Sequence, residues 1–176
     1  GEFEKTVAGH REAFTAKEVF LHATGAEAAY EQMDRMHFDL IDLELKFGEF
    51  AELAELFEFS ELVAKVGAET KAMRSDLLLV KRLWDLIAIV TSTLTEWNGT
   101  LWNDINTPLM EEESKAYSKQ IKALDKRLRE FDAYTGLEGF LKNFMVMLPC
   151  VSDLRSPSMR ERHWKQLMEI TGKEFE

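Results

Sequence analysis

Apolar residues recur at alternating spacings of three and four along most of the chain, and this spacing predicts long helices. The first such series covers residues 26–57 and has charged residues on its opposite side. Because an α-helix brings positions three and four apart onto one face, the series predicts one helix with a buried stripe and a solvated, charged face. The stripe consists of Ala26, Ala29, Met33, Met36, Leu40, Leu43, Phe47, Phe50, Ala54 and Phe57.

A second series begins after a break near residues 59–60 and predicts another long helix, which should end at Asn98 and Gly99. Trp84, Ile89 and the threonines at 91, 93 and 95 widen its apolar face, so this helix is expected to lie between neighbours. Its stripe consists of Met73, Leu77, Val80, Leu83, Ile87, Val90, Leu94 and Trp97.

Three shorter helices are predicted over residues 99–176. Thr107 is expected to cap the first of them, with Pro108 at its first helical position and Gly136 marking its end. The apolar stripe of this third helix is Tyr117, Ile121, Leu124, Leu128 and Phe131.

The fourth predicted helix contains Pro149, which should either kink it or divide it into two. Ser156 and Pro157 repeat the pattern of a cap followed by proline and predict the start of a fifth helix, which Gly172 should end. Pro149, Ser156 and Pro157 are therefore candidate hinge residues. The expected stripe of the fourth helix is Leu137, Phe140, Phe144, Met147, Val151 and Leu154, and that of the fifth is Met159, His163, Leu167 and Ile170.

The predicted fold is all-α, an elongated antiparallel bundle of about five helices with no competing strand pattern. Residues 1–25 have no sustained period and are expected to form an N-terminal arm, either as a short helix or as extended chain. Residues 1–3 are consistent with a cloning scar, and the chain is interpreted as a fragment of a longer protein. The two long helices occupy residues 26–98, and a further helical bundle occupies residues 99–176.

Composition narrows the possible partners. The formal net charge is −10, which argues against nonspecific binding of nucleic acid through its phosphates. No apolar stretch approaches the roughly 20 residues of a membrane-spanning helix, so no membrane partner is predicted. One cysteine, Cys150, excludes an internal disulfide.

The sequence contains few of the patterns that carry catalysis. It has no glycine-rich loop followed by a lysine and a hydroxyl, so this segment is not expected to hydrolyse nucleotide. Asp34 and His37 have the spacing of half a di-metal motif, but no second copy exists, and no metal site is predicted. Cys150 lies in an apolar context and is expected to be buried and structural. No catalytic residue, resident cofactor or metal ligand is therefore assigned.

A basic cluster near the C-terminus contrasts with the acidic chain. One interpretation pairs it with nearby carboxylates such as Asp153, Glu161 and Glu169; the other makes it a docking surface for another domain of the parent protein, with arginine forks and a flat tryptophan face. The residues alone favour neither. The cluster consists of Arg155, Arg160, Arg162, His163, Trp164 and Lys165.

The last half of the chain resembles the linker region of dynein heavy chains. The resemblance is carried mainly by VSDLRSPSMRERHWKQLMEITG at residues 151–172, a leucine-arginine-small-proline step followed by an Arg-His-Trp-x-x-Leu-Met helix. Upstream, WNDI at 102–105, LDKRLREFDAY at 124–134 and GL at 136–137 follow in the same order, with Phe131 where the family typically has tryptophan. The sequence DAYTGL at 132–137 is more typical of axonemal than of cytoplasmic dyneins.

This resemblance implies a non-catalytic mechanical segment on the N-terminal side of a ring of AAA+ modules. In such motors ATP and Mg act in the ring, whose cycle bends and straightens the linker and moves cargo relative to a microtubule. The implied partners are the rest of the heavy chain including the AAA+ ring, and light or intermediate chains. The microtubule would be contacted only through the parent protein. The implied location is the cytoskeleton, in a ciliary or flagellar axoneme.

Two other functions fit the helical pattern. An independent scaffold or adaptor would dimerise through the stripe of residues 26–57, and a stable dimer would support it. A helical metalloenzyme or ligand carrier would contain stoichiometric metal or a chromophore.

Overall fold

The computed structural model describes residues 2–15, 18–56 and 60–174, and within these ranges it contains helices and no strand. The predicted all-α class is confirmed, with six α-helices in the described ranges where about five were expected. The α-helices are α1 Glu2–Thr15, α2 Ala26–Leu56, α3 Ser60–Asn98, α4 Thr107–Ala123, α5 Asp132–Leu154 and α6 Glu161–Thr171. Four short 3-10 helices join them: η1 Glu18–Phe20, η2 His22–Thr24, η3 Trp102–Asp104 and η4 Lys126–Glu130.

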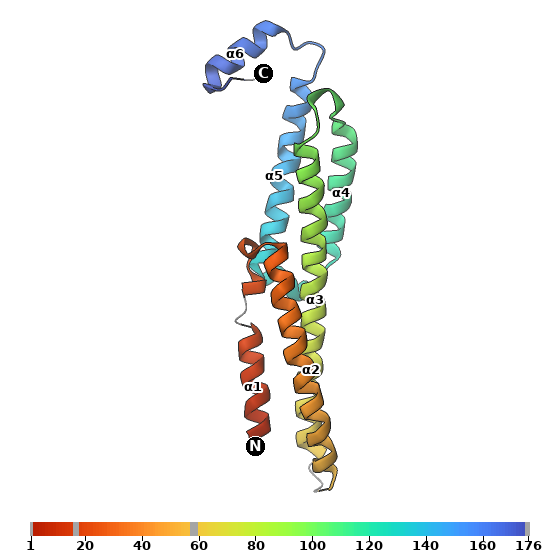
Figure 1. The fold of residues 1–176 in the computed structure, drawn as a ribbon. Coiled ribbons are helices and arrows are strands. Elements are labelled where there is room, and N and C mark those ends of the chain that lie inside the picture. The colour runs from red at the N-terminus through yellow and green to blue at the C-terminus, as the bar shows by residue number, and fades with distance from the viewer. Residues whose placement is uncertain (1, 16–17, 57–59, 175–176) are drawn as a thin grey trace.

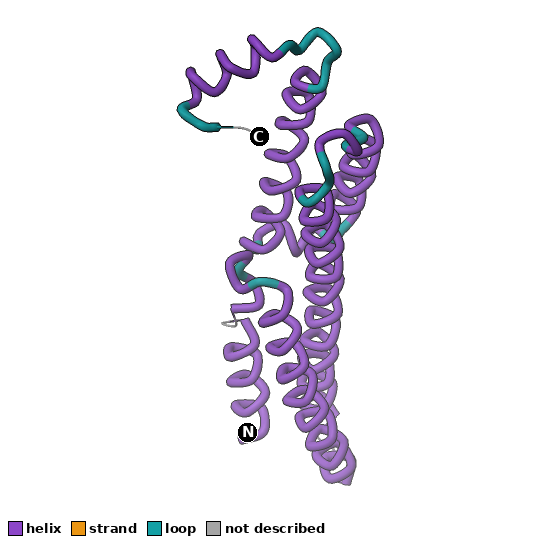
Figure 2. The backbone as a smooth tube through the Cα atoms, turned by 45° about the horizontal axis from the view of Figure 1, so that its top comes forward, coloured by secondary structure: helices purple, strands orange, loops and turns teal. Residues whose placement is uncertain are grey.

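The helices form a long, narrow stack organised around α3 (Figure 1). Helix α2 runs antiparallel to α3 from the start of α3 to beyond its middle, where Tyr30 of α2 reaches Asp85 of α3, and α1 lies beside this pair. Helices α4 and α5 pack against each other along the second half of α3. Helix α6 turns away from the end of the stack, as the tilted view also shows (Figure 2). At about 1.5 Å per residue, the 39 residues of α3 span roughly 58 Å, so this one helix connects both halves of the molecule.

The stripe predicted on α2 is its inner face. Ala29, Met33, Met36, Leu40, Leu43 and Ala54 are buried, whereas Phe57 lies outside the described residues. Phe47 packs over Gly67 of α3, where a Cβ would come within 2.9 Å of the ring. Gly67 therefore permits close approach of the two helices. Across the same pair, the Arg74 guanidinium donates to both carboxylate oxygens of Glu44, at 3.0 and 2.5 Å.

The α3 stripe is also confirmed, because seven of its eight members are buried and Trp97 packs against the core. Trp84 is fully buried, as expected from the wide apolar face. Ile89 is not: it is 52% exposed, because no described element covers that side of α3. Among the threonines, Thr93 shares a hydrogen bond with the hydroxyl of Tyr117 on α4, with 3.0 Å between the oxygens.

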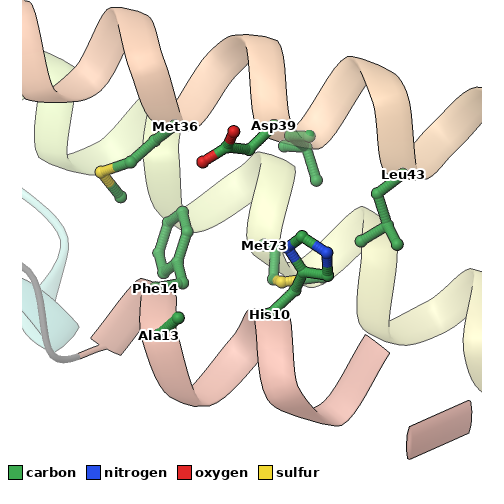
Figure 3. A pocket seen from close by; sticks show the side chains of 8 residues that line it. His10, Ala13, Phe14, Met36, Asp39, Leu43 and Met73 are labelled. Carbon is green, nitrogen blue, oxygen red and sulfur yellow. The ribbon is translucent and has the colours of Figure 1, made fainter. Parts of the chain in front are cut away.

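Residues 2–15 form a helix, which resolves the choice between a short helix and extended chain. Val7 and Phe14 bury their side chains against the α2–α3 pair. A cavity of about 40 Å³ remains between the three helices, with His10 and Phe14 facing Met36, Asp39, Leu43 and Met73 (Figure 3). A space of this size has room for one or two water molecules and not for an organic ligand.

Two predicted helix boundaries in the second half are wrong. Asn106, and not Thr107, is the N-cap of α4, and its side-chain oxygen accepts from the backbone N–H of Leu109 at 3.2 Å. The third helix was expected to continue to Gly136, but α4 ends at Ala123, because Leu124 adopts an extended backbone. Leu128 is buried, as predicted, but it belongs to the short helix η4 and not to the third predicted helix.

Gly136 does not end a helix, because α5 begins at Asp132 and continues through it. A Cβ at this position would overlap the imidazole ring of His22, which packs directly on the α5 backbone. The glycine is needed for this close approach between segments that lie more than 100 residues apart in the chain.

The stripe predicted on the fourth helix is displaced around its axis. Leu137 is buried as expected, but Phe140 and Met147 are exposed, while Leu141 and Leu148 take their places in the core. Two overlapping series with three-four spacing run along this helix, and the position of α4 selects one of them.

Pro149 lies inside α5, which continues to Leu154, so the helix is not divided there. Cys150 was expected to be buried, and this prediction is wrong. The thiol is exposed because residue 150 lies on the side of α5 away from the buried Leu141 and Leu148.

Candidate hinge and docking surface

The chain turns sharply between α5 and α6, at the position of the predicted hinge. Arg155 is the C-cap of α5, with its N–H directed at the carbonyl groups of Val151 and Asp153. Ser156 accepts through its backbone oxygen from the N–H of Met159 at 2.9 Å, which closes a four-residue turn. Pro157 occupies the second position of this turn, where its fixed φ is favourable.

The predicted start of the last helix at Ser156 and Pro157 is wrong, because α6 begins four residues later at Glu161. Arg160 is its N-cap, and the backbone N–H of Arg160 donates to Nδ1 of His163 at 3.1 Å. The turn at 156–159 separates the two helices, so proline here shapes a turn and does not open a helix. Gly172 ends α6 in the left-handed conformation, at φ 65°, as predicted.

Contacts between described residues connect this C-terminal region to the loop after α3. The guanidinium of Arg155 donates to the backbone carbonyl of Asn103 at 3.1 Å. The indole rings of Trp102 and Trp164 meet edge to face, with 5.8 Å between their centroids. Both contacts involve η3, the short helix that follows α3, so one loop supports both the end of α5 and the beginning of α6.

Helix α6 has no buried residue, although it is strongly amphipathic. Ile170, part of its predicted stripe, is 83% exposed. Lys165 pairs with Glu161 on the same helix at 3.0 Å, and both side chains are largely in solvent. Such an exposed pair contributes at most about 1 kcal/mol to stability.

The basic cluster is divided by the structure between two settings. Arg155 binds the loop carbonyl described above, whereas Arg160, Arg162 and Lys165 lie exposed on or beside α6. Arg162 Nε approaches Nε2 of His163 at 3.0 Å, while Nδ1 of the same ring faces the N–H of Arg160. A neutral imidazole has one lone-pair nitrogen, so one of these contacts at a time is a hydrogen bond. Pairing with a carboxylate is seen for Lys165 within the described part of the cluster.

A junction that the sequence did not predict lies near the middle of the molecule. The indole N–H of the fully buried Trp84 donates to the carbonyl of Val19 at 2.7 Å. The backbone N–H of His22 donates to the Asp132 carboxylate at 2.8 Å, at the start of α5. Residues 18–24 thus connect α3 to α5. Trp84 was identified as a core residue, but no pattern in residues 1–25 indicates its partner.

Beside this junction, Tyr30, Lys81 and Asp85 form a hydrogen-bonded cluster in which the pKa values of Tyr30 and Asp85 are shifted. The Tyr30 hydroxyl donates to Asp85 at 2.7 Å, and Lys81 donates to the same carboxylate at 3.0 and 2.9 Å. Burial and the neighbouring Asp85 carboxylate raise the pKa of Tyr30 to about 12. Burial acts to raise the pKa of Asp85, but the hydrogen bonds from Lys81 and Tyr30 outweigh it and hold that pKa below its ordinary value.

Within the described ranges the chain has neither a metal-binding cluster nor a membrane-spanning helix. No group of three or more His, Cys, Asp and Glu residues there is arranged to hold a metal ion. None of the described helices is both long and apolar enough to cross a membrane.

Comparison with known proteins gave consistent matches. Residues 70–176 match the family model described as dynein heavy chain, N-terminal region 2. The chain is 38% identical over 173 residues, 98% of its length, to the "Dynein alpha chain, flagellar outer arm" of Chlamydomonas reinhardtii. It is 40% identical over 149 residues, 85% of its length, to the "Dynein beta chain, ciliary" of Tripneustes gratilla, and 37% over 146 residues, 83% of its length, to the human "Dynein axonemal heavy chain 9". The matched regions cover 4%, 3% and 3% of these relatives.

Proposed function

This chain belongs to the dynein heavy chain family, and from that premise we propose that it is a non-catalytic mechanical segment of such a motor, part of the linker and the adjoining tail. Its role is to transmit movement of an ATP-driven AAA+ ring to the tail during microtubule-based motility. The names of the relatives, which are flagellar, ciliary and axonemal, support an axonemal location.

The observation that carries this proposal is the continuous helix α3, supported along its length by different partners. Helices α1 and α2 pack against its N-terminal part, α5 packs against its C-terminal part, and α4 packs on α5 and reaches α3 through the Tyr117–Thr93 hydrogen bond (Figure 1). Because close-packed helix interfaces resist deformation, this arrangement transmits displacement from one end to the other. The turn at 155–160 joins the packed helices to α6, which buries none of its residues.

The remaining parts of the proposal concern the parent protein. ATP and Mg act in the AAA+ ring and not in this segment. The ring and the rest of the heavy chain are its main partners, light or intermediate chains are further candidates, and the microtubule is contacted through other parts of the motor. The exposed basic residues on or beside α6, Arg160, Arg162 and Lys165, are suited to dock on an acidic surface of the parent.

A scaffold that dimerises through residues 26–57 is less well supported. The apolar stripe needed for that coiled coil packs against α3 of the same chain. A partner helix would have to displace α3 and expose its buried stripe.

The test uses the full heavy chain with a break introduced in α3. Leu78 is an exposed residue in the middle of α3, and Leu78→Pro removes a backbone hydrogen bond and costs about 3 kcal/mol locally. We expect the microtubule gliding velocity to fall several-fold while ATP hydrolysis by the ring continues. Leu78→Ala is the matched control and should leave both unchanged. Unchanged gliding in the proline variant would overturn the proposal.

A second measurement addresses the turn. Images of the heavy chain without nucleotide and with an ATP analogue should show different angles between α5 and α6, measured across residues 148–159. The same angle in both states would remove the hinge from the mechanism.

A further inference from the structure

The side of α2 that faces away from α3 carries a second, shorter apolar stripe. Phe38 and Leu45 are 69% and 66% exposed. At about 100° per residue these two positions lie nearly in line, on the side opposite to the buried stripe. Ile41 and Leu53 are exposed on the same side. We call this surface the outer α2 face.

Acidic residues surround and interrupt this stripe. Between residues 31 and 53, the outer α2 face carries five carboxylates and two basic residues. Each base is already paired within the helix: Arg35 with Glu31 at 3.5 Å and Lys46 with Asp42 at 2.6 Å. Its acidic members are Glu31, Asp34, Asp42, Glu49 and Glu52. Within the described part of the chain, no ion pair involves Asp34, Glu49 or Glu52, so three carboxylates on this face lack a cationic partner there.

We propose that the outer α2 face binds a basic amphipathic helix from a separate polypeptide. Leucine-like side chains of that helix pack on Phe38, Ile41 and Leu45, and lysine or arginine residues beside them pair with Asp34, Glu49 and Glu52. The arrangement has the apolar centre and polar rim of a protein interface. The inference does not depend on a mechanical role for the segment.

The charge decides between possible occupants. A second copy of this chain would bring like-charged faces together, because the acids outnumber the bases on the outer α2 face and the chain as a whole carries −10. Permanent coverage by the same polypeptide is disfavoured because the apolar side chains of this face are sparse: Phe38, Ile41, Leu45 and Leu53 are spread over about four turns. The inner stripe, by contrast, runs from Ala29 to Ala54.

The test uses two synthetic helical peptides with the same leucine stripe, one flanked by lysines and one by glutamates. Binding of each to the chain is followed by fluorescence anisotropy. We expect the lysine peptide to bind and the glutamate peptide not to bind. Equal binding of both, or of neither, would overturn the proposal.

A general attraction between a cationic peptide and an acidic protein must be separated from docking at this face. Phe38→Gln with Leu45→Gln leaves the charge unchanged and, because both side chains are exposed, should leave the thermal unfolding curve unchanged. We expect the affinity for the lysine peptide to fall about tenfold or more, which corresponds to about 1.4 kcal/mol. The control Leu78→Gln changes an exposed leucine on α3 and should keep the affinity. Similar affinities for the two variants would contradict the proposal.

The other occupants are tested in the full heavy chain and in solution. A cysteine introduced by Phe38→Cys, in a Cys150→Ser background of the purified heavy chain, should react with a maleimide at residue 38, as mass spectrometry of the labelled peptide would show. An unreactive cysteine would mean that the parent chain itself covers the face. Sedimentation of the isolated chain should show a monomer. A dimer that Phe38→Gln abolishes would assign the face to a second copy. An unreactive cysteine or such a dimer would overturn the proposal.

Discussion

The middle of the molecule and its C-terminal helix are stabilised in opposite ways. At the central junction, Trp84 is fully buried and hydrogen-bonded, and His22 packs against α5 where a methyl group would not fit. At the other end, α6 buries no residue, and its contacts with the described chain include the Trp102–Trp164 ring pair. The same chain therefore contains one closely packed interface and one that buries no residue of α6. The difference lies in how much apolar surface each interface removes from water.

The largest expected effect comes from removing the central tryptophan. Trp84→Ala should lower the free energy of unfolding by about 3–5 kcal/mol, because it leaves a large cavity and an unpaired Val19 carbonyl. The measurement is urea denaturation followed by circular dichroism. The same change at the exposed Trp102 should cost less than about 0.5 kcal/mol. Equal losses would mean that the two regions do not differ as described.

Two glycines on α5 offer a sharper comparison. Gly136→Ala should destabilise the chain by about 1–3 kcal/mol, because its methyl group would displace the His22 ring. Gly139→Ala meets no atom within 4 Å and should stabilise the helix by about 0.5–1 kcal/mol. The difference in unfolding free energy between the two variants is the readout. A stabilising Gly136→Ala would show that His22 does not pack closely on α5.

Alkaline pH should lower the free energy of unfolding, because Tyr30 loses its proton. Its pKa is raised from 10.0 to about 12 in the folded chain, so the unfolded chain loses this proton first as the pH rises. The contribution of the neutral phenol to stability is complete below pH 10 and is lost as the pH rises through about 12. The free energy of unfolding of the unmodified chain should therefore fall over this interval relative to that of Tyr30→Phe. Parallel pH curves for the two proteins would contradict the raised pKa.

The smallest effect on stability is expected for the contacts that hold the C-terminal helix α6. Trp102→Ala combined with Arg155→Ala should change the unfolding free energy by less than about 1 kcal/mol, because Trp102 is exposed and neither Arg155 nor Trp164 is fully buried. The distance distribution between spin labels at Asn143→Cys and Gln166→Cys, in a Cys150→Ser background, should become broader. An unchanged distribution would show that these two contacts do not hold α6 in place.

Much of the fold could be predicted because three-four spacing identifies helices directly. On α2 and α3 the buried stripes agree with the pattern almost residue by residue, since each helix has one dominant apolar face. On α5 the pattern was ambiguous: Phe140 and Leu141 belong to different stripes, and each gives a plausible helix. The sequence could not decide which side α4 would cover.

The candidate hinge remains a prediction, and the structure corrects the local conformation that was expected for two of its residues. Ser156 and Pro157 lie between the two helices, in a turn, and not at the first turn of α6. The cap-and-proline pattern describes local preference, and the same residues are equally favourable in a four-residue turn. The apolar residues on the outer α2 face, Phe38 and Leu45, were not distinguished from the charged residues around them.

The sequence by itself determined the helical class, the two long helices and most of their inner faces, because helix periodicity is a local property that needs no knowledge of neighbours. It also contained, in residues 70–176, the match that assigns the chain to its family. Only the tertiary structure decided the junction formed by Val19, His22, Trp84 and Gly136, and which of the two α5 stripes is buried. These features depend on contacts between segments far apart in the chain, and neither spacing nor composition encodes which distant backbone will lie against a given side chain.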